Sequence, residues 1–208
     1  MKKNLSNFKW QIVISLNGPN IDNIRKLSKK LSSKFPEVDY VSTQNQGKGN
    51  GVINGWVRSK AEIRTYMDLD LATDLESFNP MISKINQGYD VCIGSRYHKK
   101  SKIKRKFLRR IASDVYNFLL IRVLLGLNSS DVQCGFKAVN KKFIDTILPL
   151  VKDRNWFFET EMMYLAHNNK LKIVEIPVKW KEGERSSLKL RKAAPEFFGK
   201  AFKLRFRN

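Results

Sequence analysis

Short apolar runs alternate with helically spaced apolar positions along most of this chain. The runs predict strands at Gln11–Ser15, Val38–Ser42, Arg64–Met67, Asp90–Gly94, Cys134–Val139, Leu171–Ile176 and Val178–Trp180. Apolar residues that recur every three or four positions predict helices at Ile21–Ser33, Val52–Lys60, Leu75–Gln87, Phe107–Leu127, Lys141–Val151 and Phe158–Asn168. Strands that alternate with helices indicate an α/β fold, with a mostly parallel sheet and helices on both faces.

Two carboxylates stand where the predicted strand Arg64–Met67 ends. They are Asp68 and Asp70. Ligands of open α/β sheets bind at that edge. A pair of carboxylates there can hold Mg²⁺ or Mn²⁺ together with a diphosphate, and the metal stabilises the charge on a departing nucleotide diphosphate. The alternative is a solvated acidic turn before the next helix, with Asp74 as the helix cap.

The 208 residues suit one α/β domain, which we expect to cover residues 1–190. Residues 191–208 form a separate basic, amphipathic segment in which phenylalanines alternate with Lys and Arg. The formal net charge is +21, and the stretch from Arg96 to Arg122 holds ten basic residues and one acid, Asp114. Such an excess predicts an anionic partner.

Among anionic partners, an anionic membrane surface explains the charge better than nucleic acid does. The sequence shows none of the usual nucleic-acid-binding patterns. The basic, amphipathic stretch Lys99–Leu127 and the C-terminal segment suit an anionic interface. No apolar run is long enough to span a bilayer, and Cys92 and Cys134 show no metal-ligand spacing. We therefore expect a cytoplasmic protein, peripheral at the inner face of a membrane.

Five segments in fixed order carry a family resemblance. They are YMDLDLATDLESF from Tyr66, GYDVCIGSRY from Gly88, SSDVQCGFKAV from Ser129, NWFFETEMMYLA from Asn155 and IVEIPVKW from Ile173. The series resembles the polyprenyl-phosphate glycosyltransferases of glycosyltransferase family 2, in particular the dolichyl-phosphate glucosyltransferase and mannosyltransferase branch that serves protein glycosylation.

The resemblance implies a GT-A-like fold and a metal-dependent hexosyltransferase. Its donor would be a nucleotide-diphosphate sugar, UDP-glucose or GDP-mannose. Its acceptor would be a polyprenyl or dolichyl phosphate at the membrane surface, and its cofactor Mg²⁺ or Mn²⁺. The alternative is a catalytically impaired family member that binds a membrane or another subunit.

The resemblance also assigns roles near the phosphates. Asp68 and Asp70 match the metal-binding pair, and Asp70 is also a catalytic candidate. Arg96 matches an arginine near the phosphates, which a guanidinium can bridge, although it is also simply one charge in the basic stretch. Asp131 matches an acid beside the acceptor phosphate, and Lys137 is placed to pair with phosphate. The alternative for Asp131 is a turn cap.

Four further residues are substrate-binding candidates by the same resemblance. Lys48 lies in a glycine-containing turn that precedes a helix, and a helix N-terminus with a lysine suits a phosphate. The alternative is a flexible turn. Glu161 lies near the start of a helix, and the resemblance implies that its side chain faces the sugar or the metal site. Arg185 and Ser187 match a loop that closes over the donor.

At its N-terminal end the chain departs from the family pattern. Relatives open with an additional strand, so the domain is expected to be N-terminally truncated. Three outcomes are open. Gln11–Ser15 pairs directly with the strand that ends at Met67, the gene begins further upstream, or another chain supplies the strand. Asn17 stands where relatives carry an aspartate that holds the nucleoside, and only Asp22 remains nearby. We therefore expect weakened or absent donor binding.

Overall fold

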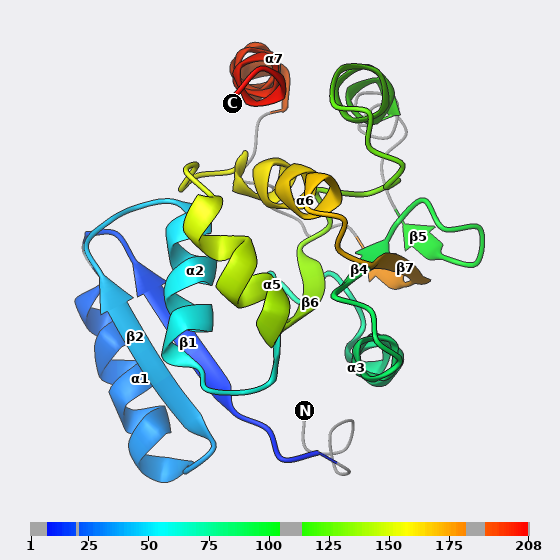
Figure 1. The fold of residues 1–208 in the computed structure, drawn as a ribbon. Helices are drawn as coiled ribbons and strands as arrows, with labels where there is room; N and C mark the ends of the chain where they lie inside the picture. The colour runs from blue at the N-terminus through cyan, green and yellow to red at the C-terminus, as the bar shows by residue number, and fades with distance from the viewer. Residues whose placement is uncertain (1–7, 20, 105–113, 182–189, 208) are drawn as a thin grey trace.

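The computed structural model describes residues 8–19, 21–104, 114–181 and 190–207 (Figure 1). The strands are β1 Ile12–Asn17, β2 Val38–Thr43, β3 Ile63–Met67, β4 Val91–Ser95, β5 Lys102–Lys104, β6 Phe136–Asn140, β7 Ile173–Pro177 and β8 Lys179–Lys181. The α-helices are α1 Asp22–Lys34, α2 Lys48–Arg58, α3 Phe78–Asn86, α5 Lys141–Thr146, α6 Phe158–Asn168 and α7 Leu190–Arg205. Two short 3₁₀ helices, η2 Leu75–Ser77 and η4 Leu148–Leu150, and a π-helix, η3 Asn117–Leu124, complete the described elements.

Most predicted elements are present, with shifted ends. The predicted helix Val52–Lys60 begins earlier, at Lys48, because the glycine turn already has helical geometry there. The predicted helix Lys141–Val151 is divided into α5 and η4, and Pro149 lies inside η4. Of the predicted helix Phe107–Leu127, residues 107–113 lie outside the described residues and Asn117–Leu124 is a π-helix.

The strands form three hydrogen-bonded groups. β1 pairs with β2, and β5 with β8, both in parallel. The central sheet has the order β3-β6-β4-β7, in which β4 and β7 are parallel and β6 runs antiparallel to both of its neighbours. Three of the five pairings are therefore parallel, which agrees with the predicted α/β sheet.

In the part of the chain that the structure describes, β1 does not pair with β3. Its hydrogen-bonded neighbour is β2, whereas that of β3 is β6. The first of the three expected outcomes, direct pairing of these two strands, is therefore wrong, and the other two stay predictions. Instead, α2 connects the two sheets, because it packs on β1 and β2 and places Trp56 against Tyr66 of β3, with ring centroids 5.6 Å apart.

Buried polar atoms mark this junction between the sheets. Ser15 of β1, Trp56 of α2 and Arg64 of β3 each hold a buried side-chain N or O atom that has no hydrogen-bond partner among the described residues. An unsatisfied buried polar group costs about 1–3 kcal/mol. These unsatisfied atoms therefore lower the stability of the fold where the two sheets meet.

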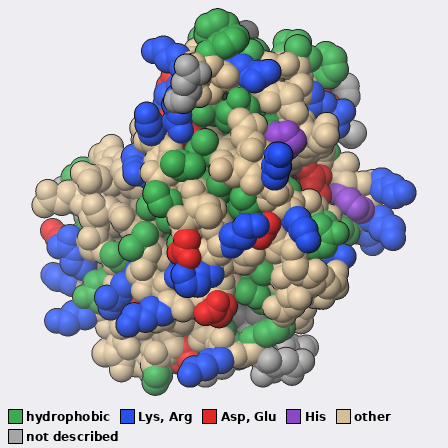
Figure 2. All heavy atoms as spheres, in the orientation of Figure 1, with side chains coloured by type: hydrophobic (Ala, Val, Ile, Leu, Met, Phe, Trp, Pro, Cys, Tyr) green, Lys and Arg blue, Asp and Glu red, His purple; other side chains and the backbone are tan. Residues whose placement is uncertain are grey.

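The surface is rich in Lys and Arg, as the net charge requires. Figure 2 shows basic side chains spread over one face of the molecule, with few acids among them. None of the helices in the described ranges is both long and apolar enough to cross a bilayer.

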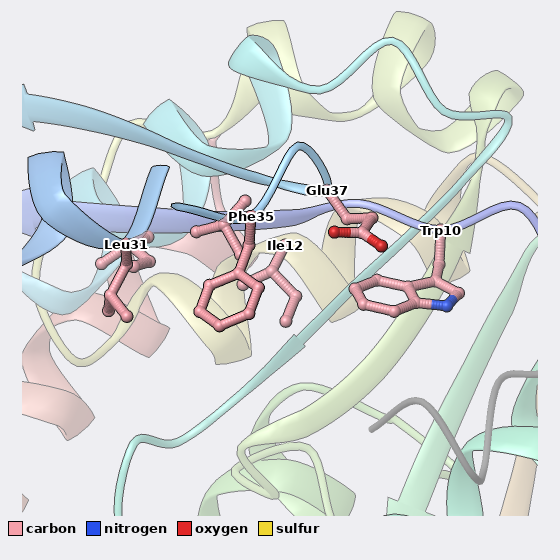
Figure 3. Close-up of a pocket in the computed structure, with 7 residues that line it drawn as sticks. Trp10, Ile12, Leu31, Phe35 and Glu37 are labelled. Atoms are coloured by element: carbon pink, nitrogen blue, oxygen red, sulfur yellow. The ribbon is translucent and has the colours of Figure 1, made fainter. Parts of the chain in front are cut away.

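Helices α1 and α2 cover opposite faces of the β1–β2 pair (Figure 1). On the α1 face lies an apolar hollow of about 310 Å³. Figure 3 shows Ile12 of β1 facing Leu31 and Phe35, with Trp10 and Glu37 at its side. Most of β1 is only half-buried as a result.

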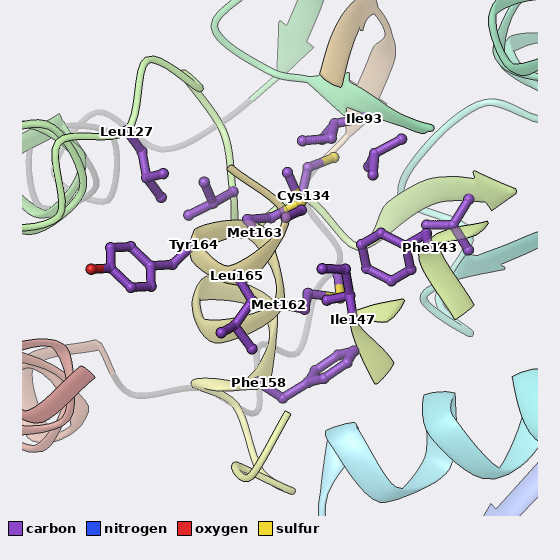
Figure 4. Packing of buried hydrophobic residues seen from close by; sticks show 14 of the residues in the cluster. Ile93, Leu127, Cys134, Phe143, Ile147, Phe158, Met162, Met163, Tyr164 and Leu165 are labelled. Carbon is purple, nitrogen blue, oxygen red and sulfur yellow. The ribbon is translucent and has the colours of Figure 1, made fainter. Parts of the chain in front are cut away.

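The main core lies around β4, β6 and α6. All of β4 is buried, and so are residues 136–139 of β6. Helix α6 is buried on every side from Phe158 to Ala166. Figure 4 shows its Met162 and Phe158 beside Phe143 and Ile147 of the α5 region. Because α6 also carries Glu159, Thr160 and Glu161 into this core, each of these polar side chains must find a partner there.

Candidate functional site

Asp68 and Asp70 follow β3 directly, at its carboxyl end. The Asp68 N–H donates to the carbonyl of Gly135 at 3.0 Å. The Asp68 side chain is 47% exposed, and Asp70 is exposed and accepts the N–H of Ala72 at 3.1 Å. The cap of the next helix, η2, is Asp74, which accepts the N–H of Glu76 at 2.9 Å. Asp74 is therefore the helix cap, as the alternative expected, and metal binding by Asp68 and Asp70 stays a prediction.

Gly135 leaves room for the Asp68 carboxylate. A Cβ built on Gly135 would lie 1.9 Å from Oδ2 of Asp68, far inside any real contact. The loop before β6 thus approaches the strand end closely at this point, because this residue has no side chain. Burial raises the pKa of Asp68 above its ordinary value, although the attraction of Lys48 partly offsets this.

Lys48 connects Asp68 to the interior. Its ammonium lies 2.9 Å from Oδ1 of Asp68 and 3.4 Å from Oε2 of Glu159. The rings of Tyr66 and Trp156 flank this ammonium, with centroids 5.8 and 5.3 Å away. Burial lowers the pKa of Lys48, but the two carboxylates outweigh that effect and raise it. Lys48 is therefore a charged side chain held by two acids.

Lys137 is completely buried on β6. Its ammonium lies 3.2 Å from Oε1 of Glu159, and it donates to the Tyr66 hydroxyl at 3.2 Å and to the carbonyl of Cys134. The Tyr66 hydroxyl in turn donates to Glu159. Protein groups therefore surround this ammonium, which does not favour a contact with phosphate. The role of Lys137 as a phosphate ligand stays a prediction.

Glu159 is the acid at the centre of this network. Burial raises the pKa of its carboxyl, but Lys137, Lys48 and the hydrogen bond from Tyr66 outweigh burial and lower the pKa to about 2. We did not single out Glu159 from the sequence. The available signal was Lys137 itself, since a lysine between apolar residues of a central strand requires a buried acid.

Arg96 and Asp131 form a second buried pair. The Arg96 guanidinium donates through Nε and Nη2 to the two carboxylate oxygens at 2.8 and 2.7 Å, and the Arg96 backbone N–H donates to Oδ2 at 2.8 Å. Asp131 is fully buried, whereas the Arg96 side chain is 15% exposed and lies over the Trp180 ring at 5.4 Å. Burial lowers the pKa of Arg96, but Asp131 outweighs it and raises the pKa. As placed, Asp131 orients Arg96.

The loop that carries Asp131 is fixed by Glu175 of β7. One carboxylate oxygen accepts the Ser129 hydroxyl at 2.7 Å and the Ser130 N–H at 2.6 Å, and the other accepts the Ser130 hydroxyl. Ser130 also hydrogen-bonds to Ser95 at the end of β4, at 2.7 Å. The Arg96–Asp131 pair therefore rests on ordered strand ends.

The remaining predicted residues lie in different surroundings. Glu161 is buried and accepts the backbone N–H groups of Lys152 and Asp153 at 3.0 and 2.6 Å and the Arg207 guanidinium at 2.6 Å. Its role toward a sugar or a metal stays a prediction. Arg185 and Ser187 lie outside the described residues.

The glycine turn before α2 packs against protein. The N–H groups of Gly49 and Asn50 donate to the carbonyls of Asn155 and Arg154 at 3.2 and 3.0 Å. Gly47 has φ +118, and a Cβ there would lie 2.2 Å from the Arg154 carbonyl oxygen. The backbone at the start of α2 therefore binds the 154–155 loop. Lys48 is the residue of this turn whose side chain pairs with Asp68 and Glu159.

A polar hollow lies at the carboxyl ends of β1 and β2. Its volume is about 590 Å³, and Gly18, Asp22, Arg25 and Gln46 are among the residues that line it. Asn17 beside it donates to the Gly47 carbonyl at 2.6 Å. The position suits a ligand of an α/β sheet.

Across the described residues, no group of three or more His, Cys, Asp or Glu side chains converges as a metal site.

Comparison with known proteins gives consistent matches. The family model described as Glycosyl transferase family 2 matches residues 2–148. The dolichyl-phosphate beta-glucosyltransferase of Saccharomyces cerevisiae is 30% identical over 203 residues, covering 88% of this chain and 60% of that protein. Glycosyltransferase AglD of Haloferax volcanii is 27% identical over 173 residues, covering 82% of this chain and 27% of that protein. The chain thus spans at most about six-tenths of the length of these relatives.

Solved structures with little sequence identity share the fold. Glucosyl-3-phosphoglycerate synthase from Mycobacterium tuberculosis, in complex with Mn²⁺, uridine-diphosphate and phosphoglyceric acid, has a TM-score of 0.66 at 11% identity and covers 98% of this chain and 71% of that chain. Its complex with Mn²⁺, UDP-glucose and phosphoglyceric acid gives 0.63 at 12% identity, covering 98% and 72%. The chain therefore has the GT-A fold.

The buried ion pair leads to a first prediction. Glu159→Gln leaves Lys137 and Lys48 without their shared counter-charge, and should lower the free energy of unfolding by about 3–5 kcal/mol at neutral pH. Urea denaturation measures this loss. The exposed Glu62→Gln should change stability by less than about 0.5 kcal/mol.

The pH dependence follows from the lowered pKa of Glu159. Its stabilisation is present above its ordinary pKa of 4.5 and is lost as the pH falls through about 2. The difference between the wild type and Glu159→Gln should therefore shrink between these two pH values. A difference that stays constant down to the lower value would contradict the assigned ion pair.

A second prediction concerns Gly135. Gly135→Ala should displace the Asp68 carboxylate and destabilise the fold by about 1–3 kcal/mol, because the new Cβ overlaps that carboxylate. Gly199→Ala in α7, where a Cβ meets nothing within 4 Å, should instead stabilise by about 0.5–1 kcal/mol. Thermal unfolding of both variants checks this opposite sign. Equal behaviour of the two would show that Asp68 does not lie against Gly135.

Proposed function

The chain belongs to glycosyl transferase family 2, and on this premise we propose that it transfers a hexose, glucose or mannose, from a nucleotide-diphosphate sugar to a polyprenyl phosphate. The names of its relatives support the acceptor, since several are dolichyl-phosphate beta-glucosyltransferases at 27–31% identity. The fold neighbours that bind UDP-glucose or uridine-diphosphate support the donor class.

One observation carries the proposal, namely the Asp68–Asp70 pair at the end of β3. Asp68 is half-exposed and Asp70 exposed, so their oxygens suit Mg²⁺ or Mn²⁺, which need only one or two carboxylates when a diphosphate supplies further ligands. The Gly135 loop leaves space for the Asp68 carboxylate. When bound, the metal would offset the charge on the departing nucleotide diphosphate.

Arg96 supplies a fixed positive charge. Asp131 holds the Nε–Nη2 edge of its guanidinium through two hydrogen bonds, so its orientation is set before any ligand arrives. We assign Asp131 to positioning Arg96, and Arg96 to the phosphates of the donor or acceptor. An acceptor phosphate is already ionised at neutral pH, so the reaction depends on positioning more than on a strong general base.

The acceptor places the reaction at a membrane. We propose that the protein works as a peripheral enzyme on the cytoplasmic face, where Lys and Arg meet anionic lipid. A second candidate function is a catalytically impaired family member that binds a membrane or another subunit. The unsatisfied buried polar atoms at the β1–β3 junction favour this alternative, because they show that the two sheets meet there with incomplete polar pairing.

Asp68→Asn and Asp70→Asn should each lower turnover on the order of 100-fold or more, because an amide holds a divalent cation poorly. The assay follows transfer of labelled hexose from UDP-glucose or GDP-mannose to a polyprenyl phosphate with Mn²⁺. Asp74→Asn, which keeps a capping side chain at η2, is the matched control and should retain activity. A wild type without turnover on either donor would favour the impaired-member alternative.

A further inference from the structure

Two neighbouring helices at one end of the molecule expose an apolar face. Helix η3 and helix α7 pack together, and the rings of Tyr116 and Phe197 meet with centroids 5.9 Å apart. Away from this contact both helices present large apolar side chains to solvent. We call this set the two-helix face, and it consists of Val115, Phe118, Leu119, Val123, Phe198, Phe202 and Phe206.

The exposure of this face is high for apolar residues. Phe118, Val123, Phe202 and Phe206 are 59–67% exposed. At the end of the chain the exposed phenylalanines recur at every fourth residue, at Phe198, Phe202 and Phe206. The neighbouring row of side chains on α7 is buried and consists of Phe197, Ala201 and Leu204. The apolar surface of this helix is therefore wider than the part that the protein covers. Figure 2 shows hydrophobic side chains gathered at the upper end of the molecule, where Figure 1 places the red α7 and the neighbouring green helix.

Basic residues accompany the apolar ones. Arg122 of η3 and Lys203 and Arg205 of α7 are exposed on the same helices. In the described residues 194–207, the only acid is Glu196, and it is already paired with Lys200 at 2.6 Å. Phenylalanine and aliphatic side chains combined with Lys and Arg suit the interface of an anionic bilayer, where rings enter the acyl boundary and cations meet headgroups.

We propose that the two-helix face inserts into the interface of an anionic lipid bilayer and so sets the orientation of the molecule on the membrane. The argument rests on exposed side chains and on charge, and it does not require the proposed transfer reaction. Nucleic acid would not require the apolar side chains. A second copy of the chain would bring the same positive charges together.

Sedimentation with vesicles tests this proposal. The probe is phosphatidylcholine vesicles with and without phosphatidylglycerol. The double variant Phe118→Ser with Phe202→Ser should lower binding to the anionic vesicles on the order of tenfold or more, because two rings that would enter the bilayer are lost. The matched control Ile24→Ser with Val57→Ser, which removes equally exposed apolar residues from α1 and α2, should bind as the wild type does.

The other outcomes overturn the proposal. Equal loss in both double variants, or none in either, would show that this face does not enter the bilayer. A wild type that is dimeric by light scattering, with only the Phe118/Phe202 variant monomeric and lipid binding unchanged, would assign the face to a second copy. The lipid measurement uses no sugar donor, so its failure is separate from failure of the proposed transfer.

A second inference comes from Lys48 and rests on the proposed function. Its ammonium already occupies Oδ1 of Asp68 at 2.9 Å, and Glu159 and two aromatic rings hold it in place. A lysine and a divalent cation both require the same carboxylate oxygen. We propose that Lys48 competes with the metal at Asp68, so that metal alone binds weakly until the phosphates of a donor draw the ammonium away.

Binding of Mn²⁺ without donor, followed by electron paramagnetic resonance of the free ion, tests this competition. Lys48→Met should bind Mn²⁺ about tenfold more tightly than the wild type, because a competing charge is removed. Lys179→Met is the matched control. It removes the same charge beside Asp74 and Glu76, just beyond Asp70, and should change the affinity less than about twofold.

Adding Asp68→Asn to Lys48→Met should abolish the gain. Equal Mn²⁺ affinity in the wild type and Lys48→Met would overturn the competition while leaving the metal in the proposed function. If Lys48→Met did not bind Mn²⁺ at all, both the competition and the metal site of the proposed function would be overturned.

Discussion

The buried ion pair between Lys137 and Glu159 is the constraint on which the candidate site depends. Neither charge reaches water, so each requires the other in place. Lys137 belongs to β6 and Glu159 to α6, and Lys48 of α2 continues the network to Asp68 after β3. Four elements that are distant in the sequence therefore converge on one set of charges, and the position of Asp68 follows from them.

The sequence predicted the elements and the strand-end acids well, because both follow from local patterns. Asp68 and Asp70 come directly after a strand in the structure, as the alternation of apolar residues required. The surroundings of Lys137 were not predictable in the same way. Its partner Glu159 is 22 residues away on a different element, and only packing of β6 against α6 brings the two together.

Strand neighbours are a further property that local pattern does not determine. The run Gln11–Ser15 predicts a strand whatever lies beside it. In the structure β1 and β3 have different neighbours, and α2 packs on both of them. The buried polar atoms of Ser15, Trp56 and Arg64 lie on the elements that border this junction. Local pattern therefore predicts that β1 is a strand, but not which strand lies beside it.

Helix α6 links the candidate site to the two-helix face through three successive polar residues. Glu159 joins the charge network, Thr160 hydrogen-bonds to Tyr116 beside η3 at 3.0 Å, and Glu161 binds Arg207 at the end of α7 at 2.6 Å. All three side chains are buried, so none can change partner without leaving an unsatisfied group. Helix η3 also reaches the loop of Asp131 directly, because Asn117 donates to the Ser130 carbonyl at 3.1 Å. The two exposed helices and the acids of the candidate site therefore share buried partners, on α6 and on the loop that carries Asp131.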